Sequence, residues 1–271
     1  MVSMARLSEI VTRAVLRLQP KPMTNSTALC SCKDYQAVLT VLRNARRLLG
    51  PSLSAFEGMW PSFYNTMFAG LPNLRRPLGT TSGIHLLIEA SGFDPDHDRG
   101  RFENFLQQMS ETDAITDAVL AENDSQTREL WAIRESVSEY GRVLGPIIAF
   151  DIGLPTSGIG MFVDEISNLI RKHWSDARVL CYGHVGDSNL HIVANVPSAG
   201  AQQPEHEMDD LVYTMVASAG GTISAEHGIG LLKKPYLDLI RSQAELETMR
   251  RIKHALDPYG ILNPGKIIDF K

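Results

Sequence analysis

The sequence predicts an α+β fold, in which helices cover one face of a mainly antiparallel sheet. Three observations favour it: helix and strand patterns alternate along the chain, the strands are short, and two late strands are joined by a turn-rich segment. The chain has 271 residues, of which 44% are hydrophobic and 21% charged, as in ordinary globular proteins. We see no sharp linker and expect one compact domain over residues 23–271, after a short N-terminal segment, residues 1–22.

Strands and helices are expected to alternate over the first part of the chain. Asp34 is a suitable N-cap for a helix that ends at Gly50, and Asp124 or Ser125 for a later one. Pro146 interrupts helical continuation before the next strand. The expected strands are Ala28–Cys30, Leu53–Phe56, Ile84–Glu89, Ala114–Leu120 and Ile147–Leu154, and the expected helices are 34–50, Arg101–Met109 and 124–140.

The last third predicts a hairpin followed by two helices. Val179–His184 and Asn189–Val196 are extended runs, with Asp187 and Ser188 as the expected two-residue turn. Pro204 opens a helix that the glycines at 220 and 221 terminate. A capping box that begins at Ser242 opens the final helix.

Composition excludes several classes of protein. The net charge of −5 offers no basic field for nucleic acid, and no apolar run is long enough for a transmembrane helix. Three cysteines cannot form a disulfide framework, so we expect a reducing, cytoplasmic location. Apolar residues at helical spacing within residues 7–18, with arginines between them, favour a mitochondrial alternative.

Two histidines flank the expected turn. With Asp187 and Ser188 at the turn, His184 directly faces His191, with Cβ atoms ~5 Å apart. Two imidazoles so placed can share a divalent cation. The alternative is a histidine pair that packs on a half-buried sheet, with each ring satisfied by backbone hydrogen bonds.

A second candidate lies between two glycine clusters, in the run GGTISAEHGIG. Glu226 could complete a His-His-Glu set with open coordination positions, as catalytic metal sites have. His227 could accept a proton, since imidazole has an unperturbed pKa near ~6.5. The alternative is a glycine-rich loop with a solvent-exposed Glu-His pair.

A third candidate is Arg134, which lies four residues before Ser138 in an expected helix. A guanidinium can grip a carboxylate at two points, and a hydroxyl can add a third hydrogen bond. The alternative is a solvated arginine at the flank of an apolar stripe. Three basic pairs are expected to be surface charge: Arg75–Arg76, Lys233–Lys234 and Arg250–Arg251.

Four ordered motifs resemble a known family: LWAIRES, GHVGDSNLH, GGTISAEHGIG and LDPYGILNPGKI. They are similar to the C-terminal half of flavin-linked D-2-hydroxy acid dehydrogenases, the group with D-lactate dehydrogenase (cytochrome) and D-2-hydroxyglutarate dehydrogenase. The resemblance implies a ferredoxin-like α+β domain that holds the substrate, while a separate N-terminal domain binds most of the FAD. Residues 1–22 then correspond to the connection with that domain, and without it we expect the chain to be inactive.

The resemblance also implies roles for individual residues. Those that match the metal ligands, with zinc as the expected ion, are His184, His191 and Glu226. His227 matches the base that takes the proton from the substrate hydroxyl. The substrate-carboxylate contacts are Arg134 and Ser138, and the residues expected beside the flavin are Asn189 and Asn263.

Two departures from the family pattern matter. Ser188 stands where the family commonly has Gly, which makes a tight turn less favourable and could shift the hairpin register. Ala149 stands where relatives that act on dicarboxylates often carry Lys, so a monocarboxylate such as D-lactate is the expected substrate.

The expected function is oxidation of a D-2-hydroxy acid to the 2-oxo acid by hydride transfer to flavin. The expected partners are a small 2-hydroxy acid and a downstream electron acceptor. The alternative is a non-catalytic metal-binding or interaction module, or a subunit that needs a flavin domain in trans and could form a homodimer. A metal-dependent hydrolase that uses the same ligands is a third reading.

Overall fold

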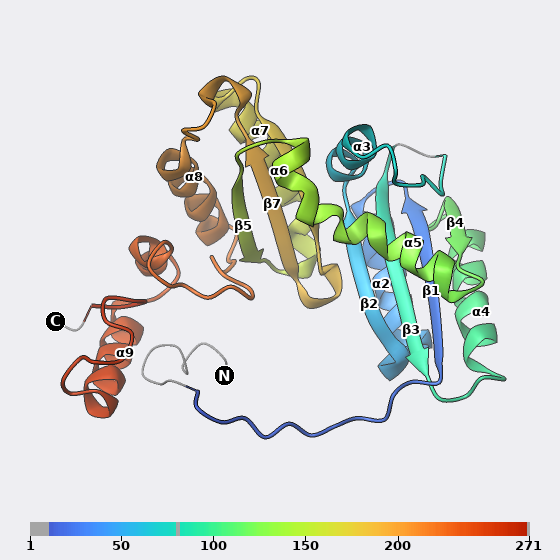
Figure 1. Ribbon diagram of the computed structural model, residues 1–271, viewed down its shortest axis with the longest axis horizontal. Helices are drawn as coiled ribbons and strands as arrows, with labels where there is room; N and C mark the ends of the chain where they lie inside the picture. Colours follow the sequence, from blue (N-terminus) through green and yellow to red (C-terminus); the bar gives the residue numbers. More distant parts are fainter. Residues whose placement is uncertain (1–10, 80–81, 270–271) are drawn as a thin grey trace. The chain divides into compact units, whose positions relative to one another are not determined.

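A computed structural model describes residues 11–79 and 82–269 of the chain (Figure 1). The chain divides into two compact units. The larger, here called the sheet unit, comprises Lys21–Phe150 and Thr156–Pro204. The smaller, here called the loop unit, comprises Met1–Pro20, Asp151–Pro155 and Glu205–Lys271. The domain boundary expected at residue 23 stays a prediction.

The sheet unit is built on a sheet with strand order β4-β1-β3-β2-β6-β7-β5. The pairs β1–β3, β1–β4, β2–β3, β2–β6 and β6–β7 are antiparallel, which confirms the predicted α+β class. Only the first half of β5 belongs to this unit. The strands are β1 Thr24–Cys32, β2 Leu53–Met59, β3 Ile84–Gly92, β4 Asp117–Leu120, β5 Ile148–Gly153, β6 Arg178–Gly183 and β7 Asn189–Asn195.

Helices connect these strands, and side-chain caps start two of them, α2 and α5. The carboxylate of Asp34 accepts a hydrogen bond from the Ala37 amide and so caps α2. For α5 the cap is Asn123 rather than Asp124 or Ser125, because its side chain accepts from the amides of Ser125 and Gln126. The helices are α2 Tyr35–Leu48, α3 Pro61–Gly70, α4 Asp98–Glu111, α5 Asp124–Glu135, α6 Tyr140–Val143 and α7 Ile159–His173, of which the sequence patterns did not predict α3 and α7.

Helices cover both faces of the sheet, where the sequence favoured one (Figure 1). β1 is buried without interruption from Ser26 to Cys32, and every residue of β7 is buried. The face under α3, α5 and α6 carries a hydrophobic core cluster, which includes Phe63, Leu180 and Val193. A polar side chain on this face is therefore removed from water.

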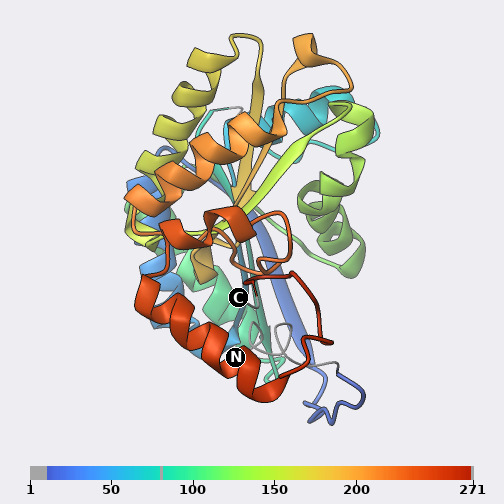
Figure 2. The ribbon, with the colours of Figure 1, turned by 90° about the vertical axis from the view of Figure 1, so that its left-hand side faces the viewer.

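The loop unit contains α8 Glu205–Ser218, the 3₁₀ helix Lys234–Leu239 and α9 Gln243–Leu256, the red helix of Figure 2. The predicted capping box at Ser242 is present, with the Glu245 side chain returning to its backbone. The end of β5 is joined to the segment after α8 by two backbone hydrogen bonds between Gly153 and Thr222. A Cβ on Gly221 would lie 2.6 Å from the Gly153 carbonyl oxygen, so only glycine fits there.

The N-terminal segment differs from the helical pattern of its sequence. Residues 1–10 of that pattern lie outside the described residues, and residues 11–22 form no helix. Val15 and Leu18 are 92% and 89% exposed, so no apolar face is packed to stabilise a helix there. Within residues 11–79 and 82–269, no helix combines the length and apolar character needed to cross a membrane.

Candidate substrate and metal site

The β6–β7 hairpin has a different register from the one predicted. His191 lies opposite Tyr182, not opposite His184. The two-residue turn is replaced by a 3₁₀ turn, Val185–Asp187, and Ser188 closes it with a left-handed φ of 62°. The larger turn moves the pairing by two residues, which is the shift that the non-glycine at Ser188 made plausible.

The two histidine rings meet nevertheless. A shift of two residues keeps every side chain on its original face, because side chains alternate with a period of two. The ring centroids of His184 and His191 are 5.4 Å apart, with the ring planes at 81°. The pairing of these two imidazoles, predicted for the wrong register, is therefore present in the structure.

Five side chains of the sheet unit, Glu57, Arg134, Tyr182, His184 and His191, form a closed circuit of contacts. One carboxylate oxygen of Glu57 lies 2.8 Å from the Nδ1 atom of His184, and the other accepts a 2.9 Å hydrogen bond from the Nε atom of Arg134. The guanidinium of Arg134 lies 4.6 Å from the centre of the Tyr182 ring, which stacks on His191 at 4.9 Å. Glu57, Arg134 and His191 are buried, so these polar groups stabilise one another away from water.

Strand pairing brings Glu57 to this place. Gly58 pairs with Gly183, which puts Glu57 next to His184 across neighbouring strands. A Cβ on Gly183 would lie 2.4 Å from the Asn189 carbonyl oxygen, so glycine is required for the close approach of β6 and β7. Sequence reasoning missed Glu57, although a lone acid within the apolar run AFEGMW was a usable signal.

Asn189, at the start of β7, has an unusual side chain. The residue is 3% exposed, and neither polar atom of its amide has a hydrogen-bond partner among the described residues. Buried polar groups are nearly always paired, with protein atoms, with water or with a ligand. The expected place of Asn189 beside a cofactor stays a prediction.

Arg134 and Ser138 do not share a helical face. α5 ends at Glu135 and continues as a 3₁₀ helix, Ser136–Glu139, in which residues three apart are aligned. Ser138 is exposed and donates to the Glu135 carbonyl. Arg134 is 7% exposed, so the reading as a solvated flank is wrong. Among the described residues, its guanidinium hydrogen-bonds only through Nε, which leaves the two terminal nitrogens for a ligand.

The loop that carries Glu226 and His227 is held by Asp151 within the loop unit. One oxygen of the Asp151 carboxylate accepts hydrogen bonds from the amides of Glu226 and His227, both at 2.8 Å, and of Ala225 at 3.1 Å. Burial raises the pKa of Asp151, but the amide hydrogen bonds and the nearby Lys233 outweigh it, so the pKa is lowered overall. The carboxylate therefore stays charged and fixes the path of the loop.

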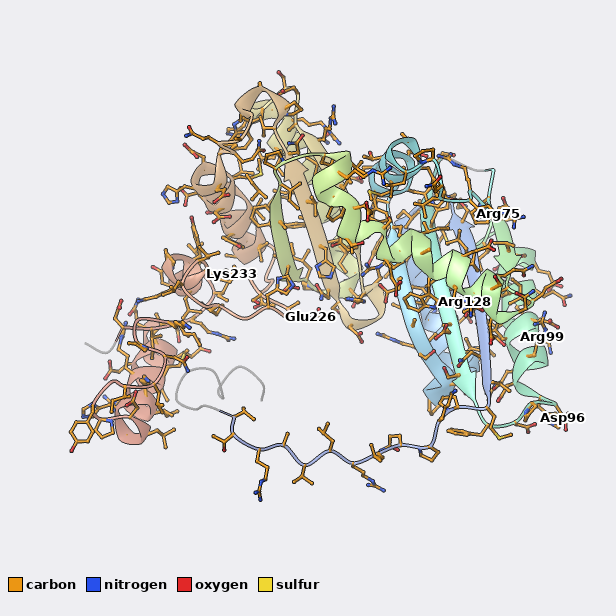
Figure 3. The ribbon with its side chains drawn as sticks, viewed as in Figure 1. Arg75, Asp96, Arg99, Arg128, Glu226 and Lys233 are labelled. Atoms are coloured by element: carbon orange, nitrogen blue, oxygen red, sulfur yellow. The ribbon has the colours of Figure 1, made fainter. Side chains whose placement is uncertain are left out.

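Lys233, labelled with Glu226 in Figure 3, corrects a prediction. It was expected to be surface charge, yet it is 9% exposed and donates to the Asp151 carbonyl at 3.1 Å. Burial lowers the pKa of Lys233 despite the opposing effect of Asp151. Arg75, also labelled, is on the surface as predicted and pairs with Glu129. Sequence reasoning missed the Lys233–Asp151 pair because the two residues are far apart in the chain.

The remaining candidate residues are placed as follows. Glu226 is exposed, and the His227 side chain is 66% exposed with its Nδ1 atom 4.0 Å from the Asp151 carboxylate. Asn263 is half-buried in the loop unit and has a left-handed φ of 47°. His184 and His191 belong to the sheet unit, and Glu226 and His227 to the loop unit. Their joint action at one site stays a prediction.

Comparison with known families identifies the chain. The family model "FAD linked oxidases, C-terminal domain" matches residues 21–267. The chain therefore belongs to this family of domains, which confirms the resemblance that the four motifs indicated.

The curated relatives include D-2-hydroxyglutarate dehydrogenases. The mitochondrial enzymes of Arabidopsis thaliana and Bos taurus are each 34% identical to this chain over 96% of its length. A putative mitochondrial D-lactate dehydrogenase of Schizosaccharomyces pombe is 30% identical over the same share. The alignments cover 46%, 47% and 51% of these relatives, so the chain spans about half of their length.

Solved structures share the fold at low sequence identity. A p-cresol methylhydroxylase matches 92% of this chain and 54% of its own, with a TM-score of 0.65 and 11% identity. A 4-ethylphenol oxidase from Gulosibacter chungangensis matches 93% of this chain and 55% of its own, with a TM-score of 0.63 and 13% identity. These likenesses establish the fold alone.

Proposed function

We propose that this chain is the substrate- and metal-binding part of an FAD-dependent dehydrogenase that oxidises a D-2-hydroxy acid to the 2-oxo acid. The observation that carries the proposal is the buried circuit in which Glu57 joins His184 to Arg134, with His191 stacked beside them. It offers imidazoles for a cation and a guanidinium for a carboxylate on one face of the sheet. Family membership and the names of the relatives support the same activity.

His184, His191 and Glu226 are the proposed ligands of a divalent cation, for which zinc suits the donor set best. The donors fit such an ion, because the two rings are close and Nδ1 of His184 is engaged by a buried carboxylate, as in many metal-binding histidines. When bound, the cation would polarise the 2-hydroxyl group of the substrate, and FAD would accept the hydride from C2. Glu226 would supply its carboxylate from the loop that Asp151 holds.

His227 is the proposed acceptor of the hydroxyl proton. Its backbone is fixed by Asp151, while its ring is exposed enough to meet a substrate. The Asp151 carboxylate lies 4.0 Å from Nδ1 of the same ring. Arg134 would bind the substrate carboxylate through its terminal nitrogens, with Ser138 as a further proposed contact.

The flavin is proposed to contact this chain at Asn189 and Asn263. The unpartnered buried amide of Asn189 supports this assignment. Most of the FAD contacts are assigned to the half of the relatives that this chain does not span. Residues 1–22 would connect to that half and residues 23–271 would form the substrate domain, so activity requires both.

Two alternative substrates are supported by different observations. Ala149 is exposed in β5 and offers no cation for a second carboxylate, which favours D-lactate. The names of several relatives favour D-2-hydroxyglutarate instead. The variant Ala149→Lys separates these alternatives: if D-lactate is the substrate, it should raise turnover of D-2-hydroxyglutarate relative to D-lactate.

The proposed cellular setting follows from the relatives. The names of the plant, animal and yeast proteins give a mitochondrial location, which favours that alternative over the cytoplasm. A downstream electron acceptor would reoxidise the flavin. A homodimer remains a proposal that gel filtration of the purified chain can test.

The direct test mixes the chain with zinc, FAD, D-lactate or D-2-hydroxyglutarate, and a dye acceptor. We expect dye reduction only when the flavin-binding half of a relative is added, and its loss in His227→Ala. Zinc binding without turnover of either acid in the mixture would instead favour the non-catalytic module. Zinc-dependent ester cleavage by the chain alone would favour the hydrolase.

A further inference from the structure

We propose that Glu57 is a positioning residue of the metal site: by accepting the Nδ1 proton of His184, it fixes the ring nitrogen that faces the cation. This inference rests on the proposed function, because it concerns the same site. No sequence motif pointed to Glu57, which is distant in the chain from every candidate ligand. Its role follows from the geometry of the sheet unit.

Both carboxylate oxygens of Glu57 have a defined partner. One lies 2.8 Å from Nδ1 of His184, and the other accepts from Nε of Arg134 at 2.9 Å. The Glu57 side chain is 7% exposed and that of Arg134 is 9% exposed. The Arg134 guanidinium places a positive charge beside the Glu57 carboxylate, and it has hydrogen-bond donors only. An ionised carboxylate can only accept a hydrogen bond.

The identity of the donor then defines the tautomer of His184. Since Glu57 can only accept, Nδ1 of His184 carries the proton. A neutral His184 in this arrangement binds a cation through Nε2 and not through Nδ1. Partners of this kind fix ring orientation and raise ligand basicity, and their loss typically costs about 10–100-fold in metal affinity.

The ring of His191 is held by a different contact from that of His184, so it serves as an internal comparison. Its ring stacks on Tyr182 at 4.9 Å, with the planes 28° apart, and the residue is 8% exposed. Stacking of this kind restrains the orientation of the His191 ring. Removal of Glu57 should therefore change the tautomer of His184 and leave that of His191 in place.

Charge adds a second effect. Without the carboxylate, the Arg134 guanidinium would remain buried and uncompensated close to His184. The positive charge of Arg134, no longer balanced by Glu57, would repel a divalent cation bound at His184. Glu57→Ala loses both carboxylate oxygens and the charge. Glu57→Gln loses the charge and keeps one carbonyl oxygen, which can accept from Nδ1 of His184 or from Nε of Arg134 but not from both. Glu57→Gln is therefore the milder of the two variants, because one acceptor remains.

The test measures ring tautomers and zinc affinity on the full chain. Long-range ¹H–¹⁵N NMR of the metal-free, ¹⁵N-histidine-labelled chain reports the tautomers, and His184→Ala and His191→Ala assign the signals among its eight histidines. Competition with a chromophoric chelator gives the zinc Kd. Glu103→Gln, a half-exposed acid on α4, is the matched control, and circular dichroism establishes that each variant is folded.

We expect the Nδ1–H form of His184 in the wild type and a mixture of tautomers in Glu57→Ala. The zinc Kd should rise about 10–100-fold in Glu57→Ala, less in Glu57→Gln and not in Glu103→Gln. An Nε2–H form of His184 in the wild type, or a zinc Kd unchanged in both Glu57 variants, would overturn the inference. A wild-type chain that binds no zinc contradicts the proposed metal site instead, and the tautomers still decide the role of Glu57.

Discussion

Two buried carboxylates support the candidate residues in the two units, and they do so through different atoms. Glu57 in the sheet unit bonds to side chains, the ring of His184 and the guanidinium of Arg134. Asp151 in the loop unit bonds to backbone amides, among them those of Glu226 and His227. The first arrangement orients functional groups on strands that are already paired, and the second fixes the path of a loop.

This difference predicts which part of the molecule each carboxylate should affect. The strands around Glu57 are held by their ladders, so changes at Glu57 should alter the site more than the fold. The loop of residues 225–227 lies outside strands and helices. The carboxylate of Asp151 accepts several of its backbone hydrogen bonds. Changes at Asp151 should therefore release the loop as well as the residues it carries.

The largest effect is expected for Asp151→Ala. The substitution leaves three amides without their acceptor and Lys233 without its counter-charge, so we expect a loss of about 3–5 kcal/mol in the free energy of unfolding. Urea denaturation gives the loss, and hydrogen exchange should show faster exchange of the amides of residues 225–227. Asp164→Ala, an exposed acid on α7, is the control. Equal exchange in both variants would contradict the role of Asp151 in the loop.

The next effect is expected at Glu57. Glu57→Ala leaves Arg134 buried and unpaired, for an expected loss of about 2–4 kcal/mol. Arg134→Ala in the same background should recover part of it, because no uncompensated charge remains. A double-mutant cycle by urea denaturation measures this coupling. Additive losses would mean that the two residues do not act as a buried pair.

A smaller effect tests the backbone of the sheet unit. In Gly183→Ala the new Cβ would lie 2.4 Å from the Asn189 carbonyl oxygen and 2.9 Å from the Leu190 Cα atom. Neither backbone atom can move without shifting β7, so we expect a loss of about 1–3 kcal/mol. Gly100→Ala, in α4 with open space around the new Cβ, should be neutral or stabilising. A neutral Gly183→Ala would contradict the tight pairing of β6 and β7.

The smallest effect concerns a third carboxylate, Asp209 of the loop unit. Burial, and then repulsion by Glu205, raise the pKa of Asp209 to about 6. The stability that this raised pKa contributes is complete below the unfolded value of 3.8 and is lost as pH rises through about 6. Asp209→Asn should therefore raise the Tm at pH 8, corresponding to a gain of roughly 1 kcal/mol in the free energy of unfolding after solvent screening, and have little effect at pH 4. The exposed Asp238→Asn is the control, and an equal Tm change at both pH values would contradict the raised pKa.

The sequence predicted the parts of the site that depend on local pattern. The hairpin, the meeting of His184 and His191, and the Glu226–His227 loop follow from alternation, turn residues and glycine clusters. The register was wrong because the 3₁₀ turn ending at Ser188 depends on backbone geometry that turn propensities do not specify. The rings of His184 and His191 meet despite this error, because a register shift of two residues keeps each side chain on the same face of the sheet.

Other features could not be predicted because they depend on long-range pairing. Glu57 reaches His184 only through the β2–β6 pairing, and Asp151 reaches its loop across 75 positions of chain. The two covered faces of the sheet were also missed, because a continuous apolar run fits a buried strand or a buried helix equally well. In each case, the missing information was which distant segments become neighbours.

The most direct test of the central claim is the zinc content of the purified chain beside His184→Ala, His191→Ala and Glu226→Gln, measured by elemental analysis after dialysis against zinc. The proposed site predicts about one zinc ion per wild-type chain, with a marked loss in each variant. A wild-type chain without zinc, or variants that retain it in full, would contradict the assignment of these three residues as ligands.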